Sequence, residues 1–593
     1  MPSDIVRVPF DREALDLWAL TDARHIDWPV VYVLDQARPH RTGRHAQESL
    51  RDIYVGETRN AAGRMRQHLV NPDKGQLDTV RVVVDETFNK SACLDLESRL
   101  IQLLSADGAY SVLNRNDGIT SANYYDRERY RGVFADVVQQ LRAEGVFTRP
   151  IPEIENSDLF KLSPFKALTQ DQAAALEDIL EGLFADLRDD RGGTIVIQGH
   201  PGTGKTVVAI YLLKLLVDIG SAPAADGFDG DSLFADFFLG EYPALLAGLR
   251  VGMVVPQQSL RESIKRVFRK TPGLDPAMVL TPFEVGQADG EWDLLLVDEA
   301  HRLNQRANQS TGVLNAKFPV INKRLFGADD LAKTQLDWIR AKSRHQILLV
   351  DEAQSVRPAD LSKESVVALL EDARARRRHY RLSTQMRVKA GADYVGYVRD
   401  VLRVPRSGHV AGSVLPRSFE SYDLRVFDDL GEMHAEIRAR DAEHGLARLV
   451  AGYAWKWASR KDTGAADIEV DGVALQWNRT SKDWIASKGA LEEVGSIHTV
   501  QGYDLNYAGV IIGSDLRYNV DLDELSVDRA SYFDTKGAEN NKQLGRSYTD
   551  AELREFISNI YGVLLTRGIR GTYVYAVDPG MRAYVRRYFQ HSA

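Results

Sequence analysis

The chain has 593 residues, of which 44% are hydrophobic and 27% are charged, and its formal net charge at pH 7 is −9. That length exceeds what one hydrophobic core fills, so we expect three or four domains, and the acidic balance excludes nucleic-acid binding through overall positive charge. The single cysteine, Cys93, excludes an intrachain disulfide and a cysteine zinc cluster. Apolar runs are too short to span a membrane and the first residues lack a signal-peptide centre, so we expect a cytoplasmic protein without membrane contact.

The amino-terminal part, residues 27–115, is predicted to be a small α/β domain. Its apolar runs and helical periodicity indicate five elements in chain order: a strand at 30–34, a strand at 52–56, a helix at 61–69, a strand at 80–84 and a helix at 91–104. A charged helical stretch at 120–147 follows. The prolines within residues 148–165 then indicate a linker.

These elements bring side chains of several catalytic types to one small sheet, namely Tyr32, Tyr54, Arg64, His68 and Glu97. A phenol or an imidazole can activate water, a carboxylate can hold one divalent metal, and a guanidinium can stabilise a pentacoordinate phosphate. The set therefore suits cleavage of a phosphodiester. Each residue alone has a plainer interpretation, because strand tyrosines are usually core residues and a helical glutamate is usually exposed.

The order and spacing of these residues resemble the GIY-YIG nuclease family across residues 28–115. Val30-Val31-Tyr32 and Tyr54-Val55-Gly56 stand where the family has its two triplets, and Asn114 stands at its late asparagine. The resemblance implies that Arg64 is catalytic and that Glu97 binds a divalent metal. Two features depart from the family: Val30 replaces the usual glycine, and segment 35–52 is longer than the usual connection. That segment is either a DNA-contacting loop or a solvated hairpin.

A glycine-rich loop lies between the apolar run 194–198 and the helical stretch 207–217, and it reads Gly199-His200-Pro201-Gly202-Thr203-Gly204-Lys205-Thr206. The glycines let backbone N–H groups turn inward around oxyanions, and the positive end of the following helix faces the same point. The loop is therefore predicted to bind the phosphates of ATP. Lys205 would reach the β- and γ-phosphates, and the Thr206 hydroxyl would bind Mg²⁺.

Two later apolar runs, 294–297 and 347–350, each end in an acid pair, Asp298-Glu299 and Asp351-Glu352. Strand-end carboxylates of this kind bind the metal and position the attacking water in phosphate-loop enzymes. We assign Asp298 to Mg²⁺, Glu299 to the water, and Gln354 to sensing the γ-phosphate. The opposite assignment, with Asp351-Glu352 as the metal strand, stays open.

From residue 168 onward, helices alternate with short apolar runs bounded by turn residues. This pattern indicates strands buried on both faces of parallel sheets. We therefore predict an α/β protein in which a GIY-YIG-like domain (1–147) and a linker (148–165) precede two RecA-like, doubly wound lobes. The first lobe, 166–378, would bind ATP, and the second would span 379–593.

The region from about 160 to 590 resembles superfamily 1 helicases through motifs in the correct order: Leu168–Gln172, the glycine-rich loop, Val254–Ser259, Arg381–Arg387, Ile497–Asp504 and Gly562–Gly568. The resemblance implies that Gln172 reads adenine and that Arg387 and Arg567 reach the γ-phosphate from the second lobe. Arg570 is an alternative to Arg567. The amino-acid sequences of segments 448–455 and 498–515 are similar to those of a bacterial Schlafen-type ATPase/helicase group within that superfamily.

Together, these resemblances imply an ATP- and Mg²⁺-dependent translocase or helicase coupled to a metal-dependent endonuclease. DNA is favoured over RNA, and DNA processing or phage defence is the implied setting. One alternative is an ATP-gated switch that licenses cleavage without translocation, and another is a nucleic-acid-binding ATPase scaffold with an inactive nuclease domain. The sequence does not reveal a partner protein or homo-oligomer, and it assigns no function to the insertions 222–241 and 304–344.

Overall fold

The computed structural model describes residues 3–36, 50–114, 124–222, 233–307, 309, 311–351, 357–385, 388, 391–403, 414–480, 484–487, 489–500, 503–535 and 537–589. The chain divides into two compact units, one made of Met1–Glu177, Ile210–Gly248 and Ile264–Pro276, the other of Asp178–Ala209, Leu249–Ser263 and Ala277–Ala593. Among the helices formed by the described residues, none is long and apolar enough to cross a membrane.

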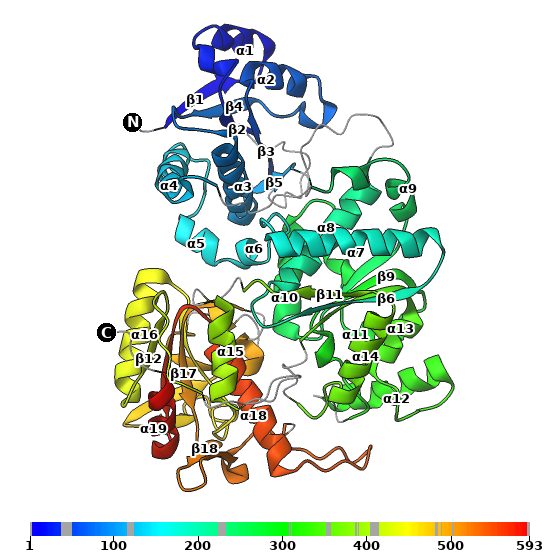
Figure 1. Cartoon of the computed structure of the whole chain (residues 1–593), viewed down its shortest axis with the longest axis vertical. Coiled ribbons are helices and arrows are strands. Elements are labelled where there is room, and N and C mark those ends of the chain that lie inside the picture. The colour runs from blue at the N-terminus through cyan, green and yellow to red at the C-terminus, as the bar shows by residue number, and fades with distance from the viewer. Residues whose placement is uncertain are drawn as a thin grey trace. The chain divides into compact units, whose positions relative to one another are not determined.

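The first unit contains a five-stranded mixed sheet in the order β1-β4-β2-β3-β5 (Figure 1). Its strands are β1 (Asp4–Pro9), β2 (Val30–Asp35), β3 (Arg51–Thr58), β4 (Thr79–Val84) and β5 (Tyr110–Val112). The central strand β2 runs antiparallel to both β3 and β4. The sequence predicted β2, β3 and β4, but it did not predict β1, whose short alternating run gives a weak signal.

Both faces of this sheet are covered by helices, listed here with their bounds: α1 (Arg12–Ala19), α2 (Ala61–Leu69), α3 (Lys90–Asp107), α4 (Arg127–Ala143), α5 (Ile151–Asn156) and α6 (Asp158–Lys161). Val31 and Val33 pack in one cluster with α3 and α4, whereas Tyr32 and Leu34 pack in another with α1 and α2. Because successive strand residues point to opposite faces, this double cover explains why β2 is apolar throughout. The predicted linker contains α5 and α6, and its Ile154 joins the α3 cluster.

Three helices cross the boundaries between the two units, namely α7 (Gln170–Arg188), α8 (Lys205–Gly220) and α10 (Gln258–Lys270), and α9 (Tyr242–Leu246) lies within the first unit. The remaining helices belong to the second unit: α11 (Pro282–Gln287), α12 (Gly312–Phe326), α13 (Gln335–Lys342), α14 (Lys363–Ala375), α15 (Gly391–Val401), α16 (Leu430–His444), α17 (Ile497–Val500), α18 (Asp550–Leu565) and α19 (Pro579–Tyr588).

The second unit holds a six-stranded sheet in the order β11-β6-β10-β9-β7-β8, and every pair in it is parallel. Its strands are β6 (Gly193–Gly199), β7 (Val251–Val254), β8 (Val279–Leu280), β9 (Trp292–Val297), β10 (Ser343–Val350) and β11 (His379–Leu382). The apolar runs predicted as buried parallel strands correspond to β6, β7, β9 and β10. Strand β11 pairs with β6, so this sheet extends past the predicted lobe boundary at residue 378.

A third, seven-stranded sheet has the order β12-β20-β17-β13-β16-β15-β14, and only the β14–β15 pair is antiparallel. Its strands are β12 (Asp423–Val426), β13 (Ala447–Ala451), β14 (Ile468–Val470), β15 (Val473–Trp477), β16 (Glu493–Ser496), β17 (Leu505–Ile512) and β20 (Gly568–Ala576). A separate hairpin joins β18 (Leu516–Asn519) to β19 (Glu524–Val527). The two largely parallel sheets are consistent with RecA-like lobes.

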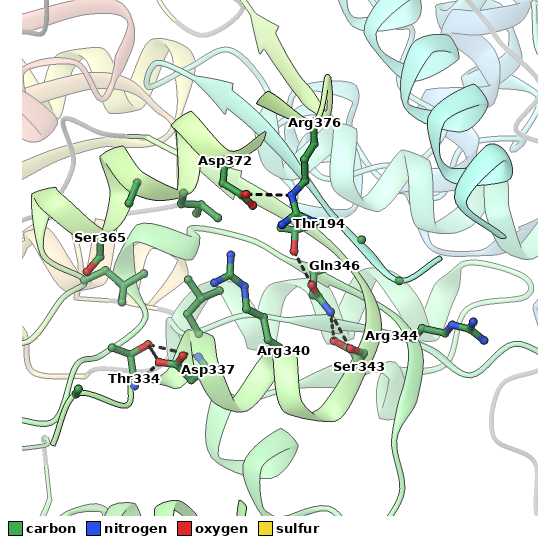
Figure 2. Close-up of a pocket in the computed structure, with 17 residues that line it drawn as sticks. Thr194, Thr334, Asp337, Arg340, Ser343, Arg344, Gln346, Ser365, Asp372 and Arg376 are labelled. Carbon is green, nitrogen blue, oxygen red and sulfur yellow. Dashed lines mark hydrogen bonds and ion pairs between the residues drawn. The ribbon is translucent and has the colours of Figure 1, made fainter. Parts of the chain in front are cut away.

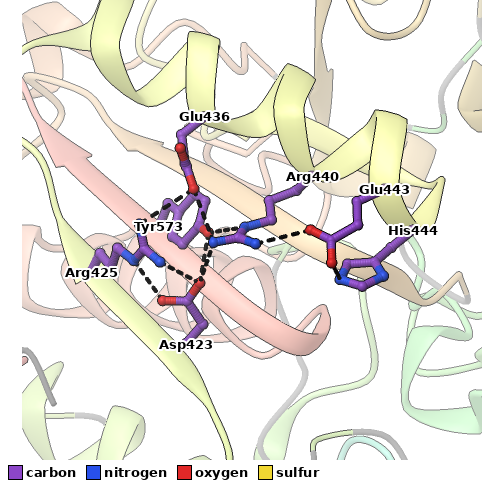
Figure 3. Close-up of polar contacts among 7 residues, drawn as sticks. All are labelled: Asp423, Arg425, Glu436, Arg440, Glu443, His444 and Tyr573. Atoms are coloured by element: carbon purple, nitrogen blue, oxygen red, sulfur yellow. Dashed lines mark hydrogen bonds and ion pairs between the residues drawn. The ribbon is translucent and has the colours of Figure 1, made fainter.

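A polar network secures one edge of the third sheet to helix α16 (Figure 3). Tyr573 on β20 donates to Asp423 Oδ2 at 2.7 Å and accepts from Arg440 Nε at 2.8 Å. Arg425 on β12 is bonded to the same aspartate, with Nε 2.6 Å from Oδ1. Because each charged group has an opposite partner, the network fixes α16 without leaving a buried charge unpaired.

The insertion 304–344 builds helices α12 and α13, which are held by an aromatic cluster in which the rings of Phe318 and Trp338 lie 4.3 Å apart. Next to α13, at the amino-terminal edge of the six-stranded sheet, is a pocket of about 770 Å³ (Figure 2). Thr194 donates to Gln346 at 2.7 Å on its wall. The pocket lies at the edge opposite the glycine-rich loop, because that loop follows the carboxyl end of β6.

Candidate phosphate-binding and nuclease sites

Strand order brings the glycine-rich loop, Asp298 and Asp351 to one edge of the six-stranded sheet. Strand β10 lies between β6 and β9 and is parallel to both. Val350 pairs with Gln198, directly before the loop, and Leu348 pairs with Val297, directly before Asp298. The carboxyl ends of three parallel strands therefore present the loop, Asp351 and Asp298 side by side, where ligands of open α/β sheets bind.

The loop has the backbone that a phosphate cradle requires. Gly202 and Gly204 have φ angles of 83° and 78°, in the left-handed region that glycine tolerates. A Cβ at Gly202 would lie 2.0 Å from Oε1 of Gln385, whose Nε2 donates to Pro201 O at 2.7 Å. Gln385 follows β11 and packs directly on the loop. The left-handed backbone is thus what requires glycine at position 202, because the end of the Gln385 side chain could move away from a Cβ.

The predicted metal-binding residues Thr206 and Asp298 meet in the structure. Thr206 Oγ1 donates to Asp298 Oδ2 at 2.7 Å, and Lys205 Nζ donates to the carbonyls of Gly199 and His200 at 2.8 and 3.1 Å. A hydroxyl beside a carboxylate is the pair of hard oxygen donors that Mg²⁺ takes from a protein when phosphate oxygens and water complete its shell. The residues present therefore fit the metal. Burial, followed by the neighbouring Glu299, raises the pKa of Asp298, a direction that a bound cation opposes.

Glu299 is held by a histidine that the sequence analysis did not single out. His301 Nδ1 accepts from the backbone N–H of Asp351 at 3.1 Å, so the ring proton lies on Nε2, which is 3.0 Å from Glu299 Oε2. Burial would raise the pKa of Glu299, but His301 and Lys205 outweigh burial and lower it. The backbone at Glu299 is left-handed, with a φ of 50°. His301 and Lys205 thus favour the ionised form of Glu299.

The second acid strand contributes Asp351, which is shared by two cations. Lys205 Nζ lies 3.7 Å from Asp351 Oδ2, and Arg399 Nη2 lies 3.7 Å from Asp351 Oδ1. Burial would raise the pKa of Asp351, but Lys205 and Arg399 outweigh burial and hold it well below its usual range. Arg399 Nη1 also lies 3.2 Å from Nδ1 of His200 in the loop.

Other predicted residues are placed less directly, or lie outside the described residues. Gln354, Arg387, Glu352 and Gln501 are not among the described residues, and neither is loop 37–49. Arg567 is 2% exposed, and its Nη1 donates to Tyr503 O at 3.2 Å beside the core of the seven-stranded sheet. Gln172 is buried in the first unit, where its Oε1 accepts from Thr169 N at 3.0 Å.

Two of the helicase-like motifs contact each other. Ser259, at the end of the motif Val254–Ser259, donates to His498 O at 3.4 Å, and Ser263 lies 2.6 Å from the hydroxyl of Tyr503. Arg357 binds the His498 ring through Nη2. Burial, followed by Arg357, lowers the pKa of His498 well below its usual range, so this histidine is a neutral acceptor. The motif Ile497–Asp504 therefore contacts helix α10, which follows strand β7 of the six-stranded sheet.

In the first unit, the structure gathers the predicted nuclease residues around Tyr32. Its hydroxyl lies 2.7 Å from His68 Nε2, and Lys74 Nζ lies 2.9 Å from His68 Nδ1. The same Lys74 nitrogen stands 3.3 Å from the centre of the Tyr54 ring. An ammonium can only donate, so His68 Nδ1 accepts and its Nε2–H points to the Tyr32 oxygen. Burial, followed by Lys74, lowers the pKa of His68 to about 3.

The strand register explains how Tyr32 is positioned. Tyr32 pairs with Gly56 across the hairpin, and a Cβ at Gly56 would lie 2.2 Å from the Tyr32 hydroxyl. Burial, then Tyr54 and Glu97, raise the pKa of Tyr32, while Arg64 opposes them, so all three side chains act on this phenol. Asn114 pins β3 by accepting from Val55 N at 3.0 Å and donating to Val55 O at 2.7 Å.

Four residues at these sites escaped the sequence analysis: Lys74, His301, Asp351 in its role as a shared anion, and Arg399. His301 stands two residues after Glu299, and histidine beside a catalytic carboxylate is a detectable signal. Lys74 lies in a turn and Arg399 in the middle of a helix, and no local spacing distinguishes either from a surface cation. Only the folded chain brings them to the sites.

Comparison with known proteins supports the resemblance of the later part of the chain to helicases. A family model described as Schlafen group 3, DNA/RNA helicase domain, matches residues 193–578. The chain is also 26% identical over 461 residues to an uncharacterized protein of Saccharomyces cerevisiae (strain ATCC 204508 / S288c). That match covers 73% of this chain and 93% of the yeast protein.

Proposed function

The chain belongs to the Schlafen group 3 DNA/RNA helicase domain family through residues 193–578, and from this premise we propose that it uses ATP and Mg²⁺ to translocate along nucleic acid or separate its strands. DNA is the favoured polymer. The observation that carries the proposal is the 2.7 Å hydrogen bond from Thr206 to Asp298, beside Lys205 and Glu299. This bond joins the hydroxyl at the start of α8 to the carboxylate that follows β9, at the carboxyl edge of one sheet.

The residues of this edge divide the work of hydrolysis in the proposed reaction. The loop amides and Lys205 bind the triphosphate, and Thr206 with Asp298 holds Mg²⁺, which neutralises charge on the phosphate oxygens when bound. Glu299 accepts a proton from the attacking water, and His301 keeps its carboxylate ionised and aimed. Two guanidiniums, Arg387 and Arg567, are proposed to stabilise the charge that develops on the transferred phosphoryl group.

The direct test measures ATP turnover by the whole chain alone and with single-stranded DNA, double-stranded DNA or RNA. We expect turnover to be stimulated by the polymer on which the protein acts, DNA most strongly, and to vanish in Lys205→Ala. Turnover of Lys205→Ala close to wild type would refute the site. Displacement of streptavidin from a tailed DNA separates a motor from an ATP-gated switch, because a switch hydrolyses ATP and displaces nothing.

We also propose that the first unit cleaves phosphodiester bonds, as a nuclease coupled to the ATPase. The supporting observation is the chain Lys74–His68–Tyr32, in which Lys74 fixes the His68 tautomer and His68 donates to the phenol oxygen. Burial raises the pKa of Tyr32, so its phenol is protonated near neutrality, and the bond from His68 fixes the direction in which its own O–H can donate to a phosphate oxygen. Glu97 would hold a divalent metal, and Arg64 would stabilise the phosphate.

Relaxation of supercoiled plasmid with added Mg²⁺ or Mn²⁺ tests this second activity. Nicking by the wild type should disappear in Glu97→Gln, while Glu155→Gln provides a matched control on a glutamate that pairs with Arg99 away from Tyr32. Equal nicking by wild type and Glu97→Gln would assign the activity to a contaminant. No nicking by the wild type in any metal would favour an inactive domain that serves as a nucleic-acid-binding scaffold.

A further inference from the structure

Arg399 is a buried cation that touches the phosphate-binding loop from an element far along the chain. Arg399 lies on helix α15. Two other residues of this helix, Tyr394 and Val398, are fully buried in the core of the seven-stranded sheet. Tyr394 anchors the helix by donating to Leu565 O at 2.9 Å. Arg399 itself is 7% exposed and reaches His200 in the loop at 3.2 Å. Helix α15 therefore brings a guanidinium from the side of the seven-stranded sheet to the loop that follows β6 of the six-stranded sheet.

The anion that Arg399 faces is the one that also faces Lys205. Asp351 lies 3.7 Å from Arg399 Nη2 through one oxygen and 3.7 Å from Lys205 Nζ through the other. Charge-assisted hydrogen bonds are usually about 2.7–2.9 Å long, so both contacts are attractions of charge rather than tight bonds. A buried guanidinium needs a counter-charge. The contact of Arg399 with Asp351 is loose enough for another anion to replace Asp351 as that counter-charge.

Asp351 occupies the electrostatic place of a phosphate. Lys205 is the residue that binds the terminal phosphates in a loop of this type. Since Arg399 shares an anion with Lys205 and contacts the loop at His200, a phosphate that takes Lys205 lies beside Arg399 too. Guanidinium geometry suits two phosphate oxygens at once, which an ammonium cannot match.

We infer that Arg399 leaves Asp351 and binds the terminal phosphate of the nucleotide, as a third arginine that α15 supplies from the side of the seven-stranded sheet. The inference rests on the proposed ATPase function and adds a residue to it. When no terminal phosphate is bound, Asp351 takes its place as the anion that holds Arg399 and Lys205 next to the loop. Loss of the terminal phosphate returns Arg399 to Asp351, so this pair distinguishes ATP from ADP.

The competing explanation is that Arg399 only neutralises buried Asp351. The double variant Asp351→Asn with Arg399→Gln separates the two explanations, because it removes the charge that would need neutralising. Under the competing explanation the double variant regains stability and the turnover and nucleotide preference of Asp351→Asn alone. Under our inference it regains stability, yet its turnover stays on the order of 10²-fold or more below that of Asp351→Asn.

Nucleotide preference provides a second measurement that does not depend on turnover. Titration with fluorescent ATP and ADP analogues should show that Arg399→Gln lowers the preference for ATP over ADP by about 10-fold or more, in the wild type and in the Asp351→Asn background alike. Arg376→Gln is the matched control, because Arg376 pairs with Asp372 at 3.0 Å on the exposed end of α14. An unchanged preference in Arg399→Gln would overturn the inference.

The outcomes also separate this inference from the proposed function. If the wild type neither binds nor hydrolyses ATP, the ATPase proposal fails, and the inference fails with it. If the wild type hydrolyses ATP and Lys205→Ala does not, the ATPase proposal stands, and the double variant and the nucleotide preference decide the role of Arg399.

Discussion

Asp515 is expected to make the second unit less stable as the pH rises. It follows strand β17 and is fully buried, with Oδ1 accepting from the Tyr561 hydroxyl at 2.6 Å. Its Oδ2 has no hydrogen-bond partner within the part of the chain that the structure describes. Burial raises the pKa of Asp515 from 3.8 to about 7, and the bond from Tyr561 only partly opposes it. The folded protein therefore holds this acid protonated near neutrality.

The size of the effect follows from the two pKa values. At about 1.4 kcal/mol per unit, a rise from 3.8 to about 7 corresponds to about 4 kcal/mol. Below pH 3.8 both folded and unfolded chains carry the proton, and the contribution to stability is fully present. As the pH rises, the unfolded chain releases the proton first, so stability falls until the folded pKa is passed. Between pH 5 and pH 8 the loss is about 3 kcal/mol.

Urea unfolding at several pH values between 5 and 8 measures this loss as a difference between wild type and Asp515→Asn. Asparagine has the shape of the protonated acid and does not ionise, so other titrating groups cancel in the difference. The wild type should lose about 3 kcal/mol relative to the variant across this range. The exposed Asp521→Asn is the control and should follow the wild type. Parallel profiles of wild type and Asp515→Asn would refute the reasoning.

Three further outcomes are expected at the two sites. Glu299→Gln should bind ATP normally and lose hydrolysis by about 10²- to 10⁴-fold. Phosphate release measures hydrolysis and nucleotide titration measures affinity, and a joint fall of hydrolysis and affinity would show that Glu299 has a binding role instead. Gly202→Ala should abolish ATP binding and lower stability by about 1–3 kcal/mol in thermal unfolding, because alanine is strained at a φ of 83°, whereas Gly248→Ala, at a similar φ of 77° in open space, should lose similar stability and keep ATP binding. Tyr32→Phe should stop plasmid nicking while leaving ATP turnover intact, and nicking at the wild-type rate would exclude the phenol from the chemistry.

The parallel sheets could be predicted because their strands are buried on both faces. Runs such as Ile195–Ile197 and Leu294–Val297 are uniformly apolar, and a turn or an acid pair follows each. Strand order could not be predicted from these runs, although it decides that β10 separates β6 from β9. The place of Asp351 between Lys205 and Arg399 depends on that order, so local patterns do not reveal it.

The amino-terminal site shows the same limit. Tyr32, Tyr54 and His68 have a spacing that indicates a shared sheet, and the structure brings them together. Lys74 lies in a turn, and only the folded turn reveals that it approaches both His68 and the Tyr54 ring. The edge strand β1 escaped for a different reason, since a short half-buried strand has too few residues for its alternation to stand out.

The left-handed backbone at Glu299 has a consequence for anyone who selects this protein for heat resistance. A glutamate with a φ of 50° costs on the order of 1–3 kcal/mol, and glycine at that position relieves the cost. Variants selected for thermal stability should therefore accumulate glycine at position 299. Each such variant would be more stable and would lack the carboxylate that the proposed ATP hydrolysis needs. A screen that also measures ATP hydrolysis would keep glutamate at position 299. Selection for stability alone and selection for stability with activity would therefore favour different residues at this position.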